Sequence, residues 1–229
     1  MPSLYEDETG VIRALVDRLG HDLEPSILIG GWATFVRVGG EISLDIDLIT
    51  SQESRHKLES LMTDLSPSHN HQGRKLRAII DDVHLDIYLP FESQLGSKLR
   101  LKVEVLAEYP DELSFERWTL LRLEAHIATK MAALLDRHFS EKGQKDAREI
   151  LALLKLDGLD PAVAAEVLHR ASTVDIKELP PLIGEAFDLI GNIIRLSKAD
   201  QNLVVAAKKS WVLELQLRAP QTQDVRPRL

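Results

Sequence analysis

The stretch LIGGWATFVRVGGEISLDIDLI, residues 28–49, decides the fold. The apolar run at residues 26–30 predicts a short strand that ends in the Gly30-Gly31 pair. Residues 32–38 predict a brief helix that a second glycine pair closes. Residues 43–50 alternate aspartate with leucine and isoleucine, which is the two-residue period of a strand with one polar face. The stretch therefore predicts the order strand, turn, helix, turn, strand.

Two aspartates stand on that polar face. Asp45 and Asp47 point to the same side, because alternate residues of a strand share a face and lie about 6.5 to 7 Å apart. Two carboxylates at this spacing can converge on one cation, or straddle two cations about 3.5 to 4 Å apart in the arrangement that stabilises in-line displacement at phosphorus. Mg²⁺ prefers such oxygen ligands. Asp86, in the strand-like run HLDIYLP, is the candidate third carboxylate, to bridge the pair or activate an attacking hydroxyl.

The aspartate pair also has a simpler interpretation as the solvated face of a half-exposed strand, which antiparallel sheets often have. Aspartate is disfavoured in strands, however, so two of them between leucine and isoleucine residues require compensation. Metal binding would supply that compensation.

The rest of the sequence has two kinds of pattern, a mixed helix and strand pattern followed by a helical one. Before about Thr119, we expect helices at residues 8–19 and 55–65 and strands at residues 75–81, 83–89, 99–106 and 112–118, with Asp81-Asp82 as a hairpin turn. After it, Ala- and Leu-rich runs predict helices at residues 120–138, 144–156, 161–171, 180–197 and 199–217. The expected class is α/β (α+β): a mixed sheet with flanking helices (residues 1–119), a C-terminal helical bundle (120–217) and a flexible tail (218–229).

Composition limits the chemistry. The chain has 229 residues, 44% of them hydrophobic, which is enough for a core of its own. It contains no cysteine, which excludes thiolate metal sites, disulfides and cysteine nucleophiles and leaves carboxylates to hold a metal. No apolar run is long enough to span a bilayer and the start is not that of a signal peptide, so we expect a cytoplasmic protein without a membrane segment. The net charge of −8 argues against a general nucleic-acid coat.

Phosphate groups have two expected places to dock. Backbone amides at the Gly30-Gly31 turn lead into a helix N-terminus, although such a pair is often only a turn. Cations cluster at Arg74, Lys75 and Arg77, and again at Lys130, Arg137, Lys142, Lys145 and Arg148. On the helix after residue 120, Arg122, His126, Lys130 and Arg137 fall within an arc of roughly 80°. Such a stripe either neutralises a triphosphate or consists of cations that extend to solvent beside a buried face.

These motifs together resemble the minimal nucleotidyltransferases, in particular the AbiEii/AbiGii toxin type. The resemblance lies in GGWA, a spacer, the run SLDIDL and a lone strand aspartate about 40 residues later, and resumes in ATKMAALLDRHFSEKGQKDAREILALL. It implies that Asp45, Asp47 and Asp86 bind two Mg²⁺ ions. It further implies nucleotide-binding roles for Gly30, Gly31, Ser43, Lys130, Arg137, Lys145 and Asp146. The chain departs from many relatives in having no arginine shortly before the acidic motif.

The implied activity is Mg²⁺-dependent transfer of a nucleoside monophosphate from an NTP to an acceptor hydroxyl. By resemblance, the acceptor is RNA, such as the end of a tRNA, or a protein side chain. The implied setting is a toxin–antitoxin or phage-defence system with a cognate antitoxin. Two alternatives stay open: a small-molecule nucleotidyltransferase of the aminoglycoside type, and a degenerate relative that binds a nucleotide or a partner without turnover.

Overall fold

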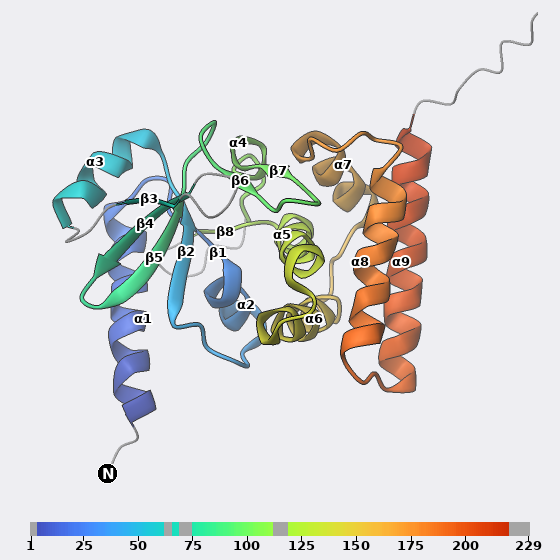
Figure 1. The fold of residues 1–229 in the computed structure, drawn as a ribbon, viewed down its shortest axis with the longest axis horizontal. Coiled ribbons are helices and arrows are strands. Elements are labelled where there is room, and N and C mark those ends of the chain that lie inside the picture. Colours follow the sequence, from blue (N-terminus) through green and yellow to red (C-terminus); the bar gives the residue numbers. More distant parts are fainter. Residues whose placement is uncertain (1–3, 62–65, 69–74, 112–118, 220–229) are drawn as a thin grey trace, which may run out of the picture.

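The computed structural model describes residues 4–61, 66–68, 75–111 and 119–219 (Figure 1). In this part of the chain, the strands are β1 (Ile27–Ile29), β2 (Asp45–Ile49), β3 (Ser66–Ser68), β4 (Lys75–Ile80), β5 (Val83–Tyr88), β6 (Gln94–Leu95), β7 (Leu101–Lys102) and β8 (Thr119–Leu120). The helices are α1 (Leu4–Asp22), α2 (Gly30–Val38), α3 (Gln52–Leu61), α4 (Val103–Leu106), α5 (Leu123–Arg137), α6 (Glu141–Leu153), α7 (Pro161–Ala171), α8 (Leu179–Ile193) and α9 (Lys198–Arg218). The expected mixed α/β class is confirmed.

The main sheet has the strand order β3-β4-β5-β2-β1-β8. Its pairing is mixed, because β2 runs parallel to β5 and β1 parallel to β8, whereas the other neighbours are antiparallel. The tight connection from β4 to β5 passes through Asp81 and Asp82, both with positive φ, as a two-residue hairpin turn requires. The expected strand, turn, helix, turn, strand unit is β1-α2-β2.

The period-two pattern of the strands separates two cores. Ile46 and Leu48 of β2, with Leu85 and Ile87 of β5, pack on one face of the sheet against α1, α2 and α3. On the opposite face, Ile27, Ile29, Ile49 and Tyr88 join a second core with α4 to α9. Asp45 and Asp47 have the same parity as Ile49, so alternation places them on this second face. One sheet face thus carries polar residues at one end and packed apolar residues at the other.

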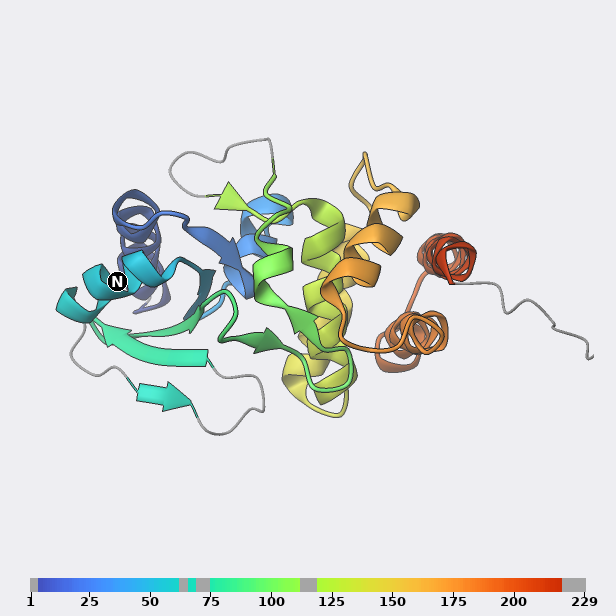
Figure 2. The same ribbon diagram turned by 90° about the horizontal axis from the view of Figure 1, so that it is seen from above.

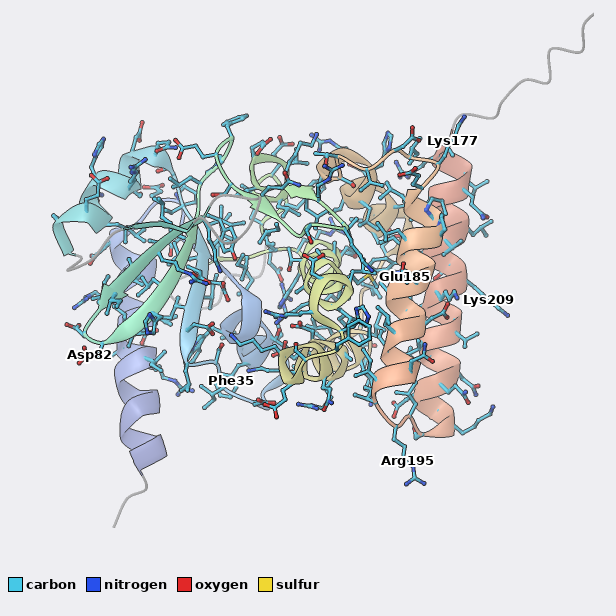
Figure 3. The ribbon with its side chains drawn as sticks, viewed as in Figure 1. Phe35, Asp82, Lys177, Glu185, Arg195 and Lys209 are labelled. Carbon is cyan, nitrogen blue, oxygen red and sulfur yellow. The ribbon has the colours of Figure 1, made fainter. Side chains whose placement is uncertain are left out.

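Helices α5 and α6 lie between the sheet and the α8–α9 pair (Figures 1 and 2). In Figure 3, Phe35 lies on α2 beside this central region and Asp82 marks the tip of the β4–β5 hairpin, while Glu185 and Lys209 mark α8 and α9. The second core runs without interruption from β1 and β2 into these helices. The expected domain boundary near Thr119 stays a prediction, and it falls inside a shared core.

Several expected elements differ in the structure. The strand predicted at residues 99–106 is wrong beyond Lys102: the chain turns into helix α4 there, because Val103 and Leu106, three residues apart, are both fully buried. The helix predicted from residue 120 begins at Leu123, since Thr119 and Leu120 pair with β1. The strand expected at residues 112–118 and the tail from residue 220 lie outside the described residues. No described helix is long and apolar enough to cross a membrane.

Candidate active site

The acidic residues meet on two neighbouring parallel strands. The register of β2 and β5 sets Asp47 directly opposite Asp86, and Asp45 opposite His84. All four residues share one sheet face, because paired positions of neighbouring strands have the same orientation. The strand register thus brings together carboxylates that are about forty residues apart in the sequence.

A cavity of about 360 Å³ opens between this sheet face and helices α5 and α6. All the residues to which the family resemblance assigned a role lie on its wall: Gly30, Gly31, Ser43, Asp45, Asp47, Asp86, Lys130, Arg137, Lys145 and Asp146. Their proximity is observed, while their individual roles stay predictions.

Among the three aspartates, Asp47 has the fewest partners that would stabilise its negative charge. Burial, reinforced by the negative charges of Asp45 and Asp86, raises its pKa to about 7. Among the described residues it accepts no hydrogen bond and forms no ion pair. The pKa of Asp45 moves the other way: burial alone would raise it, but the Ser43 hydroxyl, which donates to this carboxylate, and the Lys142 ammonium outweigh burial and lower it. A cation bound between Asp45 and Asp47 would therefore be stabilised by their negative charges.

Asp86 is differently placed. One of its carboxylate oxygens accepts from the buried Lys75 ammonium, and the other accepts from Arg77 Nε at 3.2 Å. Among the residues that the structure describes, no three carboxylate or histidine side chains are gathered closely enough to hold a metal ion. The metal-binding role of Asp86 stays a prediction, whereas Asp45 and Asp47 offer the hard oxygen donors that suit Mg²⁺.

The glycine pair lets the N-terminus of α2 approach these carboxylates. Gly30 has φ +68°, and a Cβ atom there would collide with the Asp47 carboxylate, 2.9 Å from its Cγ. A Cβ on Gly31 would lie 2.8 Å from Ser43 Cβ and 3.7 Å from Lys145 Nζ. Only glycine fits both positions. The first-turn amides of α2, with the Lys145 ammonium beside them, form the kind of site that binds phosphate.

Helix α5 brings two further cations to the cavity, and α6 supplies the carboxylates that hold them. Arg137 donates two hydrogen bonds to the Asp146 carboxylate, at 2.6 and 2.9 Å, and Lys130 lies 3.5 Å from the same residue. Lys130 also donates to Glu149. Burial works against the charge on Arg137, but the bonds to Asp146 raise its pKa above the ordinary value. Asp146 therefore holds the two cations in place, and its own oxygens are occupied by them.

The expected cationic stripe on α5 divides in the structure. Lys130 and Arg137 line the cavity, but Arg122 pairs with Glu124 at 3.0 Å. His126 is buried within the core, with Nε2 3.2 Å from the Thr34 hydroxyl. Burial lowers its pKa well below the ordinary value, so it is neutral near pH 7. The helical arc alone does not distinguish positions that face the cavity from positions that face α2.

Lys75, Arg77 and Lys142 were expected only as members of cation clusters where phosphate could dock, and Tyr88 was not singled out from the sequence; all four line the cavity. A signal for the first two existed, because Lys75 and Arg77 alternate on a strand whose hairpin partner carries Asp86. Pairing the two strands from the Asp81-Asp82 turn sets Arg77 opposite Asp86. Lys142, which lies 3.6 Å from Asp45, comes from α6 and has no such local signal.

A second cavity, of about 770 Å³, adjoins the first. The two share the walls formed by Ser43, Asp45, Arg77, Asp86, Lys142 and Lys145. His84 and the exposed Leu44 line only the second cavity. The carboxylates thus stand between a cation-rich cavity and a wider one, as a reaction between two substrates requires.

No protein-family model and no curated protein sequence matches the chain. Among solved structures, the chain is similar to one described as "ANT(2")-Ia in complex with adenylyl-2"-tobramycin", with 18% sequence identity and a TM-score of 0.37. The match covers 90% of this chain and 99% of that one. At this identity and score, nothing about that protein is transferred to this chain.

Proposed function

We propose that this protein is a Mg²⁺-dependent nucleotidyltransferase, which moves a nucleoside monophosphate from an NTP to an acceptor hydroxyl. One observation carries the proposal: a single cavity joins the Asp45–Asp47 pair, the N-terminus of α2 and the cations of α5 and α6. The cavity wall holds six cationic side chains against four carboxylates, which suits a triphosphate that arrives with a divalent cation: Lys75, Arg77, Lys130, Arg137, Lys142 and Lys145 against Asp45, Asp47, Asp86 and Asp146.

The residues divide the work of phosphoryl transfer. The first-turn amides of α2 and Lys145 bind phosphate oxygens, while Lys130 and Arg137, both fixed by Asp146, orient the rest of the triphosphate. Asp45 and Asp47 would hold the metal. A bound Mg²⁺ supplies charge stabilisation for the displacement. The acceptor hydroxyl gives up its proton to solvent and its oxygen forms a bond to the α-phosphorus. The bond from the α-phosphorus to the oxygen that bridges to the β-phosphate breaks, and pyrophosphate leaves. Positioning and electrostatics supply most of the catalysis.

The acceptor would occupy the second cavity, which reaches the carboxylates through Asp45 and Asp86. The resemblance to AbiEii-type enzymes supports an RNA or protein acceptor and a toxin with a cognate antitoxin.

The test measures transfer of label from each of four α-labelled NTPs, with Mg²⁺, to the protein itself, to total RNA and to small hydroxyl compounds. We expect one NTP to label one class of acceptor, and Asp45→Ala and Asp47→Ala to abolish labelling. Asp157→Ala, which removes an exposed carboxylate in the turn after α6, is the matched control and should keep full activity. If wild type and variants are equally inert but bind nucleotide, the degenerate binding protein replaces the enzyme.

A further inference from the structure

Lys75 occupies an unusual position for a surface-strand lysine. It opens β4 on the wall of the cavity, is only 9% exposed, and donates its ammonium hydrogen to Asp86. Its Nζ atom lies 5.8 Å from the centroid of the Tyr88 ring. A carboxylate and an aromatic face thus hold the ammonium from two sides, so that it replaces its lost hydration with fixed partners.

The strand pattern builds this position. Leu76 and Ala78 alternate with Lys75 and Arg77, and Ala78 packs into the core on the far face of the sheet. Lys75 and Arg77 therefore face the cavity, where the hairpin register sets Arg77 opposite Asp86. Between them, the two cations occupy both oxygens of Asp86. The negative charge of Asp86 is compensated by the protein itself.

The other two carboxylates are not compensated in this way. Asp47 forms no ion pair among the described residues, and the charges of Lys75 and Lys130 act on it only through space. Asp45 forms an ion pair with Lys142, whose Nζ lies 3.6 Å away on a side chain that is 69% exposed and screened by solvent, and the charge of Lys145 acts on it more weakly. The site thus has one carboxylate with a buried, permanent cation and one adjoining pair that lacks such a cation.

We propose that this site holds one divalent ion, between Asp45 and Asp47, and that the Lys75 ammonium takes the place of a second ion at Asp86. The inference rests on the proposed function, because it assumes that the cavity binds a metal–nucleotide complex. A second divalent ion at Asp86 would have to displace a buried ammonium from its carboxylate and lie beside that positive charge. Lys75 supplies a positive charge that does not exchange with solution. The family resemblance implied two metal ions, and this arrangement predicts one.

The experiment counts metal ions without turnover. Mn²⁺ replaces Mg²⁺, a non-hydrolysable α,β-methylene NTP supplies the phosphates, and electron paramagnetic resonance measures bound Mn²⁺ per chain and any coupling between neighbouring ions. We expect one uncoupled ion in wild type and two coupled ions in Lys75→Met, which keeps the length of the side chain and removes its charge. Lys75→Arg keeps the charge and should bind one ion. Lys209→Met, which removes an exposed lysine of α9 outside the cavity, is the matched control and should also bind one.

Asp86→Asn keeps the test decisive if Lys75→Met does not fold, which circular dichroism will show. Because Asp86 is not a metal ligand in this arrangement, the variant should still bind one ion, with an affinity within about threefold of wild type. The loss of a direct ligand should lower the affinity by more than about hundredfold, which is the upper end for loss of an outer-shell partner.

The outcomes separate the two proposals. Two coupled ions in wild type, or a large loss of affinity in Asp86→Asn, overturn the one-ion inference and leave the nucleotidyltransferase proposal standing. One ion in both wild type and Lys75→Met overturns the role given to Lys75. Absence of any metal–nucleotide binding by folded wild-type protein overturns both proposals.

Discussion

Gly30 is the residue on which the approach of helix α2 to the carboxylates depends. Its φ of +68° is a region that other residues enter only with strain, and a Cβ atom would collide with Asp47. We expect Gly30→Ala to destabilise the protein by about 3 kcal/mol and to abolish label transfer, because backbone strain and collision add together. Urea unfolding and the labelling assay check the two parts of the prediction.

Gly158→Ala is the control for this substitution. Gly158 also has a positive φ, +86°, but open space surrounds the position of its missing Cβ. We expect a loss of about 1 kcal/mol from the backbone alone, with label transfer unchanged. Equal losses of stability and activity in the two variants would show that the contact with Asp47 is unimportant.

Asp47 makes the metal-free protein sensitive to pH. Its pKa is about 7 in the folded chain against 3.8 when unperturbed, so the folded state keeps a proton that the unfolded state has lost. The stability that this group contributes therefore falls as pH rises from about 4 to about 7 and is constant above that. We expect Asp47→Asn to be more stable than wild type in EDTA at pH 8, with a difference that shrinks toward pH 4.

Thermal unfolding across this pH range measures the difference. Added Mg²⁺ with nucleotide should stabilise wild type and not the variant, because the variant lacks the carboxylate that would hold the ion. A difference between the two proteins that does not vary with pH would contradict the raised pKa of Asp47.

Helix α5 carries a buried histidine between the site and the core. The Thr34 hydroxyl donates to the Gly30 carbonyl at 3.2 Å and also contacts His126 Nε2, so this ring nitrogen acts as the donor and the neutral Nε2–H form is assigned. His126 Nδ1 is buried and has no hydrogen-bond partner within the part of the chain that the structure describes. The pair connects α5 to the first turn of α2, one helical turn from Lys130. A proton on His126 would bring an unpaired charge into this contact.

Acid should therefore weaken this junction. The pKa of His126 is lowered well below 6.5 by burial, and then by the positive charges of Lys130 and Arg37, so the unfolded chain takes up the proton first. The stability contribution of the neutral ring is complete above about pH 6.5 and declines below it. We expect the stability advantage of wild type over His126→Gln, measured by thermal unfolding, to decrease from pH 7.5 to pH 5. A flat difference would show that the folded protein accepts the proton readily.

At the scale of elements, the helices after residue 120 were the most predictable from sequence. Their apolar positions recur at helical spacing over many residues, and Ser140, Asp160 and Ser197 cap α6, α7 and α9 at their starts. Short segments were less predictable. LRLKVEVL alternates like a strand, yet tertiary burial of Val103 and Leu106 selects a helical turn.

The whole molecule shares one large core across the predicted boundary near Thr119. Ile27, Ile29, Ile49 and Tyr88 of the sheet pack in the same cluster as α5 to α9. We therefore expect one cooperative unfolding transition. Single-tryptophan variants that retain only Trp32, in the sheet half, or only Trp211, in the helical half, should report the same urea midpoint. Residues 1–119 alone should not fold, because their half of this core would face water.

Two separate midpoints would contradict the shared core. In that case the boundary near Thr119 would divide two independently stable domains, and the cavity between sheet and helices would lie between bodies that move relative to each other. A single midpoint would mean that the carboxylates and the cations of α5 and α6 keep a fixed geometry.

Local sequence pattern is sufficient to predict that two of the carboxylates share one strand face near a glycine turn. A two-residue period places Asp45 and Asp47 on one strand face, and the glycine pair before α2 marks the close approach of backbone to that face, because both are local properties of the chain. Only the tertiary structure shows which cation forms an ion pair with each carboxylate. Strand register pairs Asp86 with Lys75 and Arg77. Helix packing places Lys142 beside Asp45 and buries His126 against Thr34. The contacts of Lys142 with Asp45 and of His126 with Thr34 join residues far apart in the sequence, so helix packing decides them. Arg77 and Asp86 belong to one hairpin, whose register follows from the local Asp81-Asp82 turn.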